Sequence, residues 1–206
     1  MPKGKSSKRA HRQSPDANEI LVMELQEIHS AETQLARLLP RFAKAVEAEE
    51  LRRCIEQRQE ESERIIEELD AAFDELEERP GRKRNPAAEG LISDAREHVQ
   101  ELAQGPARDV VLLGAMQKLE HYCIAAWGTA RSLAEALGEE IPAGAMERAL
   151  EEGKAFDERL TELAESEVNP ALLSSTEESE SDEEEEAPAP HTRARKESGS
   201  SRRVAQ

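Results

Sequence analysis

Apolar residues recur along most of this chain at intervals of three and four positions, the spacing that places them on one face of an α-helix. Five segments show this pattern, at about 15–48, 50–78, 86–104, 110–137 and 143–167. Helix-ending residues follow the segments, at Arg79-Pro80-Gly81, Gly105-Pro106, Gly138 and Asn169-Pro170. Pro40 lies inside the first segment, where we expect a kink or a break. The pattern therefore predicts four long helices and one shorter helix.

Polar residues interrupt the apolar face of each long helix near its middle. They are Glu32 in the first, Arg58 and Glu61 in the second, Glu120 and Cys123 in the fourth, and Asp157 or Glu152 in the last. A buried carboxylate costs several kcal/mol unless it is paired, metal-bound or protonated. Glu32 and Glu120 therefore need partners on other helices. We expect the interruptions to meet at one level inside a four-helix bundle.

Some of these residues have an alternative position on the solvent side. Glu61 and Glu152 each have an acidic neighbour in the sequence that could face the core in their place. The side chains of Glu61 and Glu152 can therefore point to solvent instead. Glu32 and Glu120 are in register with flanking apolar residues, which favours burial. His121 is one position away from the apolar face, and we expect it to meet a neighbouring helix or the surface rather than a metal.

Composition agrees with a helical core and limits the classes of function. Charged residues make up 35% of the 206 residues and aromatic residues 2%, and the net charge is −17. A core of Leu, Ala, Val and Ile suits packed helices. Residues 1–14 hold five basic and no acidic residues, so the central region is strongly acidic. Such a region is a poor binder of nucleic acid or anionic membranes, and only weak contact by the basic N-terminus is expected.

The chain divides by composition into three regions. We predict a disordered basic N-terminus at 1–14, a helical bundle at 15–172, and a disordered acidic, low-complexity tail at 173–206. A second basic stretch, RPGRKRNP at 79–86, forms a loop inside the bundle region. No apolar segment follows the basic N-terminus and no apolar run approaches the length of a membrane span, so we expect a soluble cytoplasmic protein.

The sequence contains no recognisable catalytic motif. No Ser/His/Asp or Cys/His arrangement, Gly-rich phosphate loop or nucleotide fingerprint has suitable spacing. Cys54 and Cys123 fall in predicted helices without CxxC or CxxH spacing, and we expect two reduced core thiols. These observations favour a protein without catalytic activity.

Several stretches resemble the YciE/YciF family of ferritin-like bacterial proteins, over about residues 19–171. The most specific stretch is Gln117-Lys118-Leu119-Glu120-His121-Tyr122, followed by Ile124-Ala125-Ala126-Trp127-Gly128-Thr129. Further matches are Ala31-Glu32-Thr33-Gln34-Leu35, Glu60-Glu61-Ser62, Glu89-Gly90-Leu91-Ile92 and Asp157-Glu158-Arg159-Leu160-Thr161. The resemblance implies an all-α, ferritin-like antiparallel four-helix bundle with one extra short helix. It also implies a homodimer and an association with stress responses.

The chain departs from the family pattern at three positions where that pattern has metal ligands. Arg58 stands in place of a histidine, Cys123 in place of a glutamate, and Gly153 in place of a glutamate. The metal-ligand candidates that remain at family positions are Glu32, Glu61, Glu120 and Asp157. The resemblance thus implies a di-iron site that has lost part of its ligand set.

Arg58 suggests how the remaining carboxylates are compensated. A guanidinium is a permanent cation with five donors, so it can neutralise Glu32, Glu61 and Glu120 without a metal. We therefore expect no cofactor, no catalysis and a metal-free bundle. The alternative is an iron-binding or di-iron oxidase-like protein that uses Cys123, with Glu152 as a further substitute ligand, because thiolate is a good iron ligand.

Overall fold

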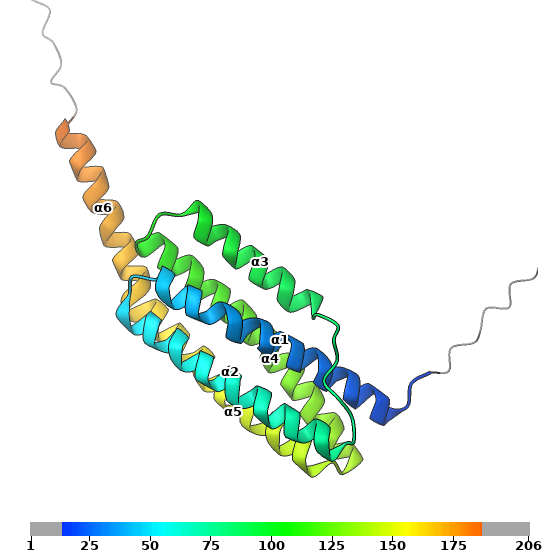
Figure 1. Cartoon of the computed structure of the whole chain (residues 1–206). Coiled ribbons are helices and arrows are strands. Elements are labelled where there is room, and N and C mark those ends of the chain that lie inside the picture. The colour runs from blue at the N-terminus through cyan, green and yellow to red at the C-terminus, as the bar shows by residue number, and fades with distance from the viewer. Residues whose placement is uncertain (1–13, 187–206) are drawn as a thin grey trace, which may run out of the picture.

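The computed structural model describes residues 14–186, and this part of the chain contains helices and no strands (Figure 1). The elements are α1 (Ala17–Ala45), α2 (Glu49–Glu75), α3 (Pro86–Glu101), α4 (Pro106–Leu137), α5 (Glu140–Leu163), the π-helical turn η1 (Ala164–Val168) and α6 (Asn169–Glu186). The four long helices and the shorter α3 correspond to the five predicted segments. Within residues 14–186, no helix combines the length and apolar composition needed to cross a membrane.

The four long helices form an antiparallel bundle. The hairpin of α1 and α2 packs against the hairpin of α4 and α5, with α1 beside α4 and α2 beside α5 (Figure 1). Since α2 and α4 run in the same direction, the chain must return along the bundle between them. Helix α3 makes this return and packs on α1 and α4. The predicted ferritin-like antiparallel four-helix bundle with one extra short helix is confirmed.

Local sequence explains where the helices begin and end. Asp16 caps α1, accepting from the Glu19 amide at 2.8 Å while the Glu19 carboxylate accepts from the Asp16 amide at 2.9 Å. Asn85 caps α3 by accepting from two amides of its first turn. Gly138 ends α4 in the left-handed conformation, with φ of 78°, which a glycine adopts without a Cβ clash.

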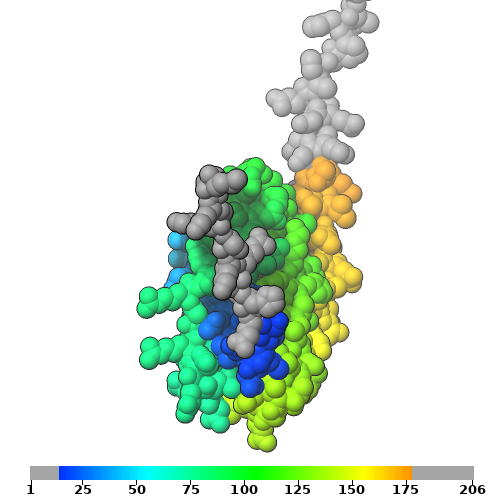
Figure 2. All heavy atoms as spheres, turned by 90° about the vertical axis from the view of Figure 1, so that its right-hand side faces the viewer, coloured from blue at the N-terminus to red at the C-terminus, as the bar shows by residue number. Residues whose placement is uncertain are grey.

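The structure narrows one prediction and corrects another. Of the kink or break expected at Pro40, the break is excluded, because helix α1 continues through Pro40 to Ala45. Asn169-Pro170 does not end the last long helix, because η1 leads directly into α6. Pro170 has no amide hydrogen, and it directly follows η1, where the helix departs from the regular i→i−4 hydrogen-bond pattern. Helix therefore extends past residue 173, where the acidic tail was predicted to start, and α6 projects from the bundle (Figures 1 and 2). The rest of the predicted tails, at 1–13 and 187–206, lies outside the described residues.

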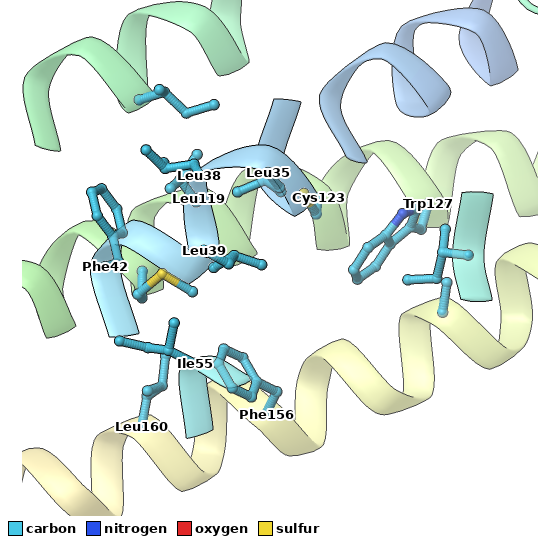
Figure 3. Close-up of a cluster of buried hydrophobic side chains, with 14 of the residues drawn as sticks. Leu35, Leu38, Leu39, Phe42, Ile55, Leu119, Cys123, Trp127, Phe156 and Leu160 are labelled. Atoms are coloured by element: carbon cyan, nitrogen blue, oxygen red, sulfur yellow. The ribbon is translucent and has the colours of Figure 1, made fainter. Parts of the chain in front are cut away.

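The core is aliphatic, with few aromatic rings. Figure 3 shows a cluster in which α1, α2, α4 and α5 all take part; its labelled members include Leu35, Leu39, Phe42, Ile55, Leu119, Phe156 and Leu160. Burying a Leu or Ile side chain contributes about 1.5–3 kcal/mol. Cys123 and Trp127 of α4 continue this cluster along the bundle axis (Figure 3). They lead to a buried polar site in the same core.

Candidate functional site

Arg58 lies inside the bundle, where its guanidinium joins two buried carboxylates. Its Nη1 and Nη2 atoms each donate to one oxygen of Glu32 at 3.2 Å, and Nε donates to Oε2 of Glu120 at 2.8 Å. All three side chains are at most 1% exposed. The structure thus brings together three predicted positions, from α1, α2 and α4. One permanent cation faces two carboxyl groups.

Ser62 completes this hydrogen-bond network. Its hydroxyl accepts from Nη1 of Arg58 at 2.6 Å and donates to Oε2 of Glu32 at 2.8 Å. The helical pattern alone allows either Glu61 or Ser62 to face the core, and packing selects Ser62, four residues after Arg58. We refer to Glu32, Arg58, Ser62 and Glu120 as the central cluster.

Trp127 also contacts the guanidinium, and the sequence analysis did not predict this contact. The guanidinium carbon of Arg58 lies 5.5 Å from the centre of the indole ring, within the range of a cation–π interaction. Trp127 is 1% exposed, so the contact is shielded from water. The sequence did place Trp127 on the core-facing side of α4, four residues after Cys123 and seven after Glu120. That spacing identifies the face of the helix but not the partner.

Glu120 is the less compensated of the two carboxyl groups. Its Oε1 atom is buried and has no hydrogen-bond partner among the described residues. Burial raises the pKa of Glu120 to about 7, although the adjacent Arg58 acts to lower it. Protonation of Glu120 as the pH falls below about 7 therefore removes one negative charge from the central cluster.

Cys123 is a buried neighbour of these charges. Burial raises the pKa of its thiol well above the usual range, and the charges of Glu32 and Glu120 raise it further. The side chain is therefore a neutral thiol at physiological pH rather than a thiolate. Cys54 is also buried, and both cysteines are free, which confirms the expected pair of reduced core thiols.

Two other predicted site residues lie on the partly exposed side of their helices. Glu61 accepts a hydrogen bond from Nε2 of Gln57 at 2.9 Å and makes none to Arg58. Burial raises the pKa of Glu61. Glu152 accepts from Nη1 and Nη2 of Arg64 at 2.7 and 2.5 Å, and the two side chains are 37% and 41% exposed. Neither carboxylate joins the central cluster.

Asp157 also lies apart from the central cluster. Its Oδ2 atom is 3.4 Å from Nε2 of His121, whose side chain is 67% exposed, as expected for a histidine that meets a neighbouring helix at the surface. His29 pairs with Asp70 of α2 at 3.2 Å. Across residues 14–186, no group of three or more His, Cys, Asp or Glu side chains is arranged to hold a metal ion.

Gly153 lets α5 approach the central cluster closely. A Cβ atom at this position would lie 2.3 Å from Cζ3 of Trp127 and 2.7 Å from Oε1 of Glu120. Both distances are shorter than real Cβ contacts allow, so even an alanine requires the indole to move. The glutamate of the YciE/YciF pattern has no room here while Trp127 occupies its present position.

Comparisons with known proteins agree with this architecture. The model of a family described as a domain of unknown function, DUF892, matches residues 16–173, more than three quarters of the chain. The chain belongs to the DUF892 family. YciF from Escherichia coli (strain K12) is 38% identical to this DUF892 member over 152 residues, which are 73% of this chain and 92% of YciF. The resemblance to the YciE/YciF family is therefore confirmed.

Solved structures support the same fold for this DUF892 member. The crystal structure of the Escherichia coli stress protein YciF has a TM-score of 0.72 and 36% identity, and the match covers 76% of this chain and 99% of that one. YcfI from Rhodopseudomonas palustris has a TM-score of 0.70 and 30% identity, covering 74% of this chain and 97% of that one. The DUF892 model, which matches residues 16–173, takes in the helices that build the bundle.

Proposed function

We propose that this DUF892 member is a cytoplasmic, non-catalytic bundle protein of the YciF type that acts in a stress response without a metal centre. The stress association rests on similarity to YciF, which is described as a stress protein. The observation that carries the metal-free assignment is the position of Arg58, whose guanidinium bonds Glu32 and Glu120 at once. The guanidinium supplies to these two carboxyl groups the positive charge that a metal ion would otherwise supply.

The side chains of the central cluster do not fit a di-iron centre. Ferritin-like di-iron proteins use carboxylates from all four helices and a histidine three residues after a glutamate on two of them. Here Arg58 offers donors and no lone pair, so it cannot ligate a metal, and its charge repels a cation at the same place. Gly153 contributes no ligand, and its close packing against Trp127 leaves no space for one.

A structural role for the central cluster follows from its connections. Arg58 links α2 to α1 through Glu32 and to α4 through Glu120, so one side chain ties three helices together. The bonds require a particular rotation of each helix, since a shift of one residue turns a side chain by about 100°. We therefore assign to the central cluster the task of fixing helix register, a use known for buried polar groups in helical bundles.

The alternative is an iron-binding or di-iron oxidase-like protein in which Cys123 supplies a ligand. Its support is the burial of Cys123 beside Glu32 and Glu120, because thiolate is a good iron ligand. The raised pKa of this thiol opposes it, since a proton must leave before a metal can bind. Glu152 would also have to leave its bidentate bond with Arg64. The metal-free bundle is therefore preferred.

Metal content tests the proposal directly. The full chain would be incubated anaerobically with ferrous iron, desalted and measured by elemental analysis, beside the variants Arg58→His and Arg64→His. We expect wild type and the surface control Arg64→His to retain well below one iron per chain, and Arg58→His to retain more. Stoichiometric uptake of two irons by wild type would overturn the proposal, and Cys123 would then be the first candidate ligand to test.

A homodimer is the expected assembly, as the YciF-type resemblance implies. Light scattering of the full chain during size-exclusion chromatography would then give about twice the monomer mass of 22.9 kDa. A mass equal to the monomer at micromolar concentration would rule this assembly out. The measurement is independent of metal content, so the two parts of the proposal can fail separately.

A further inference from the structure

A positively charged cleft lies between α1, α3 and the loop that joins α2 to α3. Its volume is about 340 Å³, and five of its lining residues are cationic. They are Arg37, Arg82, Lys83, Arg84 and Arg96. None of the lining residues is Asp or Glu, although the chain as a whole carries a net charge of −17. We call this feature the basic cleft.

Most of these cations have no side-chain partner among the residues that the structure describes. Arg84 pairs with Glu89 at 3.2 Å and donates to Oε1 of Gln34 at 3.1 Å. Within residues 14–186, the other four cations make no ion pair or hydrogen bond. Like charges gathered at one place repel one another, which opposes folding unless an anion compensates them. The gathering therefore points to an external anion.

The cationic loop is fastened to α1 at both ends. Near its start, Nε2 of Gln26 donates to the carbonyl oxygen of Arg79 at 2.9 Å. At its end, the amide of Asn85 donates to Oγ of Ser30 at 2.8 Å, and Nε2 of Gln34 donates to the carbonyl oxygen of Asn85 at 3.2 Å. These bonds hold Arg82, Lys83 and Arg84 over the cleft, so its shape is largely preformed.

We infer that the basic cleft binds a compact anion carrying several phosphate groups, such as an inorganic polyphosphate or the triphosphate of a small molecule. Arginine forks match phosphate oxygens in pairs, and four of the five cations are arginines. The volume suits a small molecule. The one aromatic ring among the lining residues is the imidazole of His29. It already packs edge-on against Phe73 and pairs with Asp70, so it offers a base little surface for stacking. Recognition therefore rests on the phosphates.

A long nucleic acid is a poorer match for the same surface. It would extend beyond 340 Å³ and run over a protein surface of net negative charge. Repulsion there opposes the attraction of the cleft. A compact anion can make all its contacts within the cleft and avoid that cost. The assignment does not depend on the central cluster, whose residues do not line the cleft.

Binding of sodium tripolyphosphate to the full chain, measured by calorimetry at low ionic strength, tests the inference. The test variant is Arg37→Gln/Arg96→Gln, which removes one cation of α1 and one of α3 from the lining of the cleft. The matched control is Arg41→Gln/Lys154→Gln, which removes the same charge from exposed residues outside the cleft. Each lost charge-assisted bond weakens binding severalfold or more, so we expect a Kd about tenfold or more weaker for the test variant. The control should stay close to wild type.

Further ligands define what the basic cleft recognises. Orthophosphate should bind more weakly than tripolyphosphate, because it engages fewer cations at once. A nucleoside triphosphate that binds as tightly as tripolyphosphate supports recognition through phosphates alone. Absence of tripolyphosphate binding, or equal weakening by the test and control variants, would overturn the inference. Tighter binding of a 20-base-pair DNA duplex than of tripolyphosphate, lost in the test variant, would replace the compact anion with nucleic acid.

Discussion

Replacing Arg58 with alanine removes a cation that bonds two buried carboxyl groups, Glu32 and Glu120. The change breaks the bonds to both oxygens of Glu32, to Oε2 of Glu120 and to Oγ of Ser62. It also removes the guanidinium that faces the indole of Trp127. The backbone of α2 should be undisturbed, because alanine has a high helix propensity. The loss of stability should therefore report on the central cluster.

The burial of the partners sets the size of this loss. Glu32 and Glu120 are at most 1% exposed, so water cannot replace the guanidinium without entering the core. Removing one member of a buried ion pair typically costs about 3–5 kcal/mol, and we expect a loss of unfolding free energy in this range. Domains of this kind are usually stable by about 5–15 kcal/mol, so the variant should fold but unfold at much lower denaturant.

Urea unfolding followed by circular dichroism measures the loss, with Arg64→Ala as the matched control. Arg64 is on the same helix and makes an equally bidentate bond, to Glu152, but both side chains are more than a third exposed. Exposed ion pairs contribute about 0–1 kcal/mol, so the control should lose little stability. The comparison separates burial from the number of hydrogen bonds.

The pH dependence separates electrostatics from packing. Arg58 acts to lower the pKa of Glu120, so without Arg58 that pKa should rise further, and protonation of Glu120 becomes the main way to remove buried charge. The penalty of Arg58→Ala should then be smaller at pH 5 than at pH 8, whereas the loss of packing is the same at both. A penalty no larger than that of Arg64→Ala, or one independent of pH, would refute the reasoning.

Three further substitutions and one control, Gly128→Ala, test neighbouring parts of the bundle by urea unfolding. Burial raises the pKa of Glu120 to about 7, above its value in the unfolded chain, so wild type should lose stability as the pH rises through 7. In Glu120→Gln this group no longer titrates, so the fall in unfolding free energy between pH 5 and pH 8 should be smaller than in wild type by up to about 3 kcal/mol. Parallel pH profiles for the two proteins would contradict this assignment. Gly153→Ala should destabilise by about 2 kcal/mol or more, because the new Cβ meets Trp127 at 2.3 Å. The control is Gly128→Ala, where a new Cβ would have no neighbour within 4 Å, and it should stabilise α4 by about 0.5–1 kcal/mol. Equal changes in stability for Gly153→Ala and Gly128→Ala would exclude a clash at Gly153. Asp109→Asn should lower the unfolding free energy by about 1–2 kcal/mol, because the Asp109 carboxylate accepts hydrogen bonds from the backbone amides that precede α2. An unchanged urea midpoint would show that these hydrogen bonds are dispensable.

The sequence was sufficient for the helices and for three members of the central cluster. A helix of more than twenty residues repeats its apolar spacing over several turns, so one or two polar residues do not obscure which face is buried. For the same reason Glu32, Arg58 and Glu120 stood out, since each occupies a core position in an otherwise apolar series. All three are buried, and Arg58 contacts both carboxyl groups.

The sequence could not distinguish residues that are adjacent on the helix surface. A step of one position turns the side chain by about 100°, and both Glu61 and Ser62 lie near the edge of the core-facing stripe. Packing decided that Ser62 faces Glu32 and that Glu61 does not. Asp157 likewise lies toward His121 at the edge of α5 rather than in the central cluster.

Contacts between distant parts of the chain were decided by tertiary structure alone. Arg37 and Arg96 are 59 positions apart, and the sequence shows only a basic loop between their helices. They share a cleft because α3 returns along α1 while Asn85 and Gln34 hold the loop in place. Periodicity records which face of a helix is buried, because that is a local property of the chain. It does not record which helix lies opposite, since that depends on how all four helices minimise exposed apolar surface together.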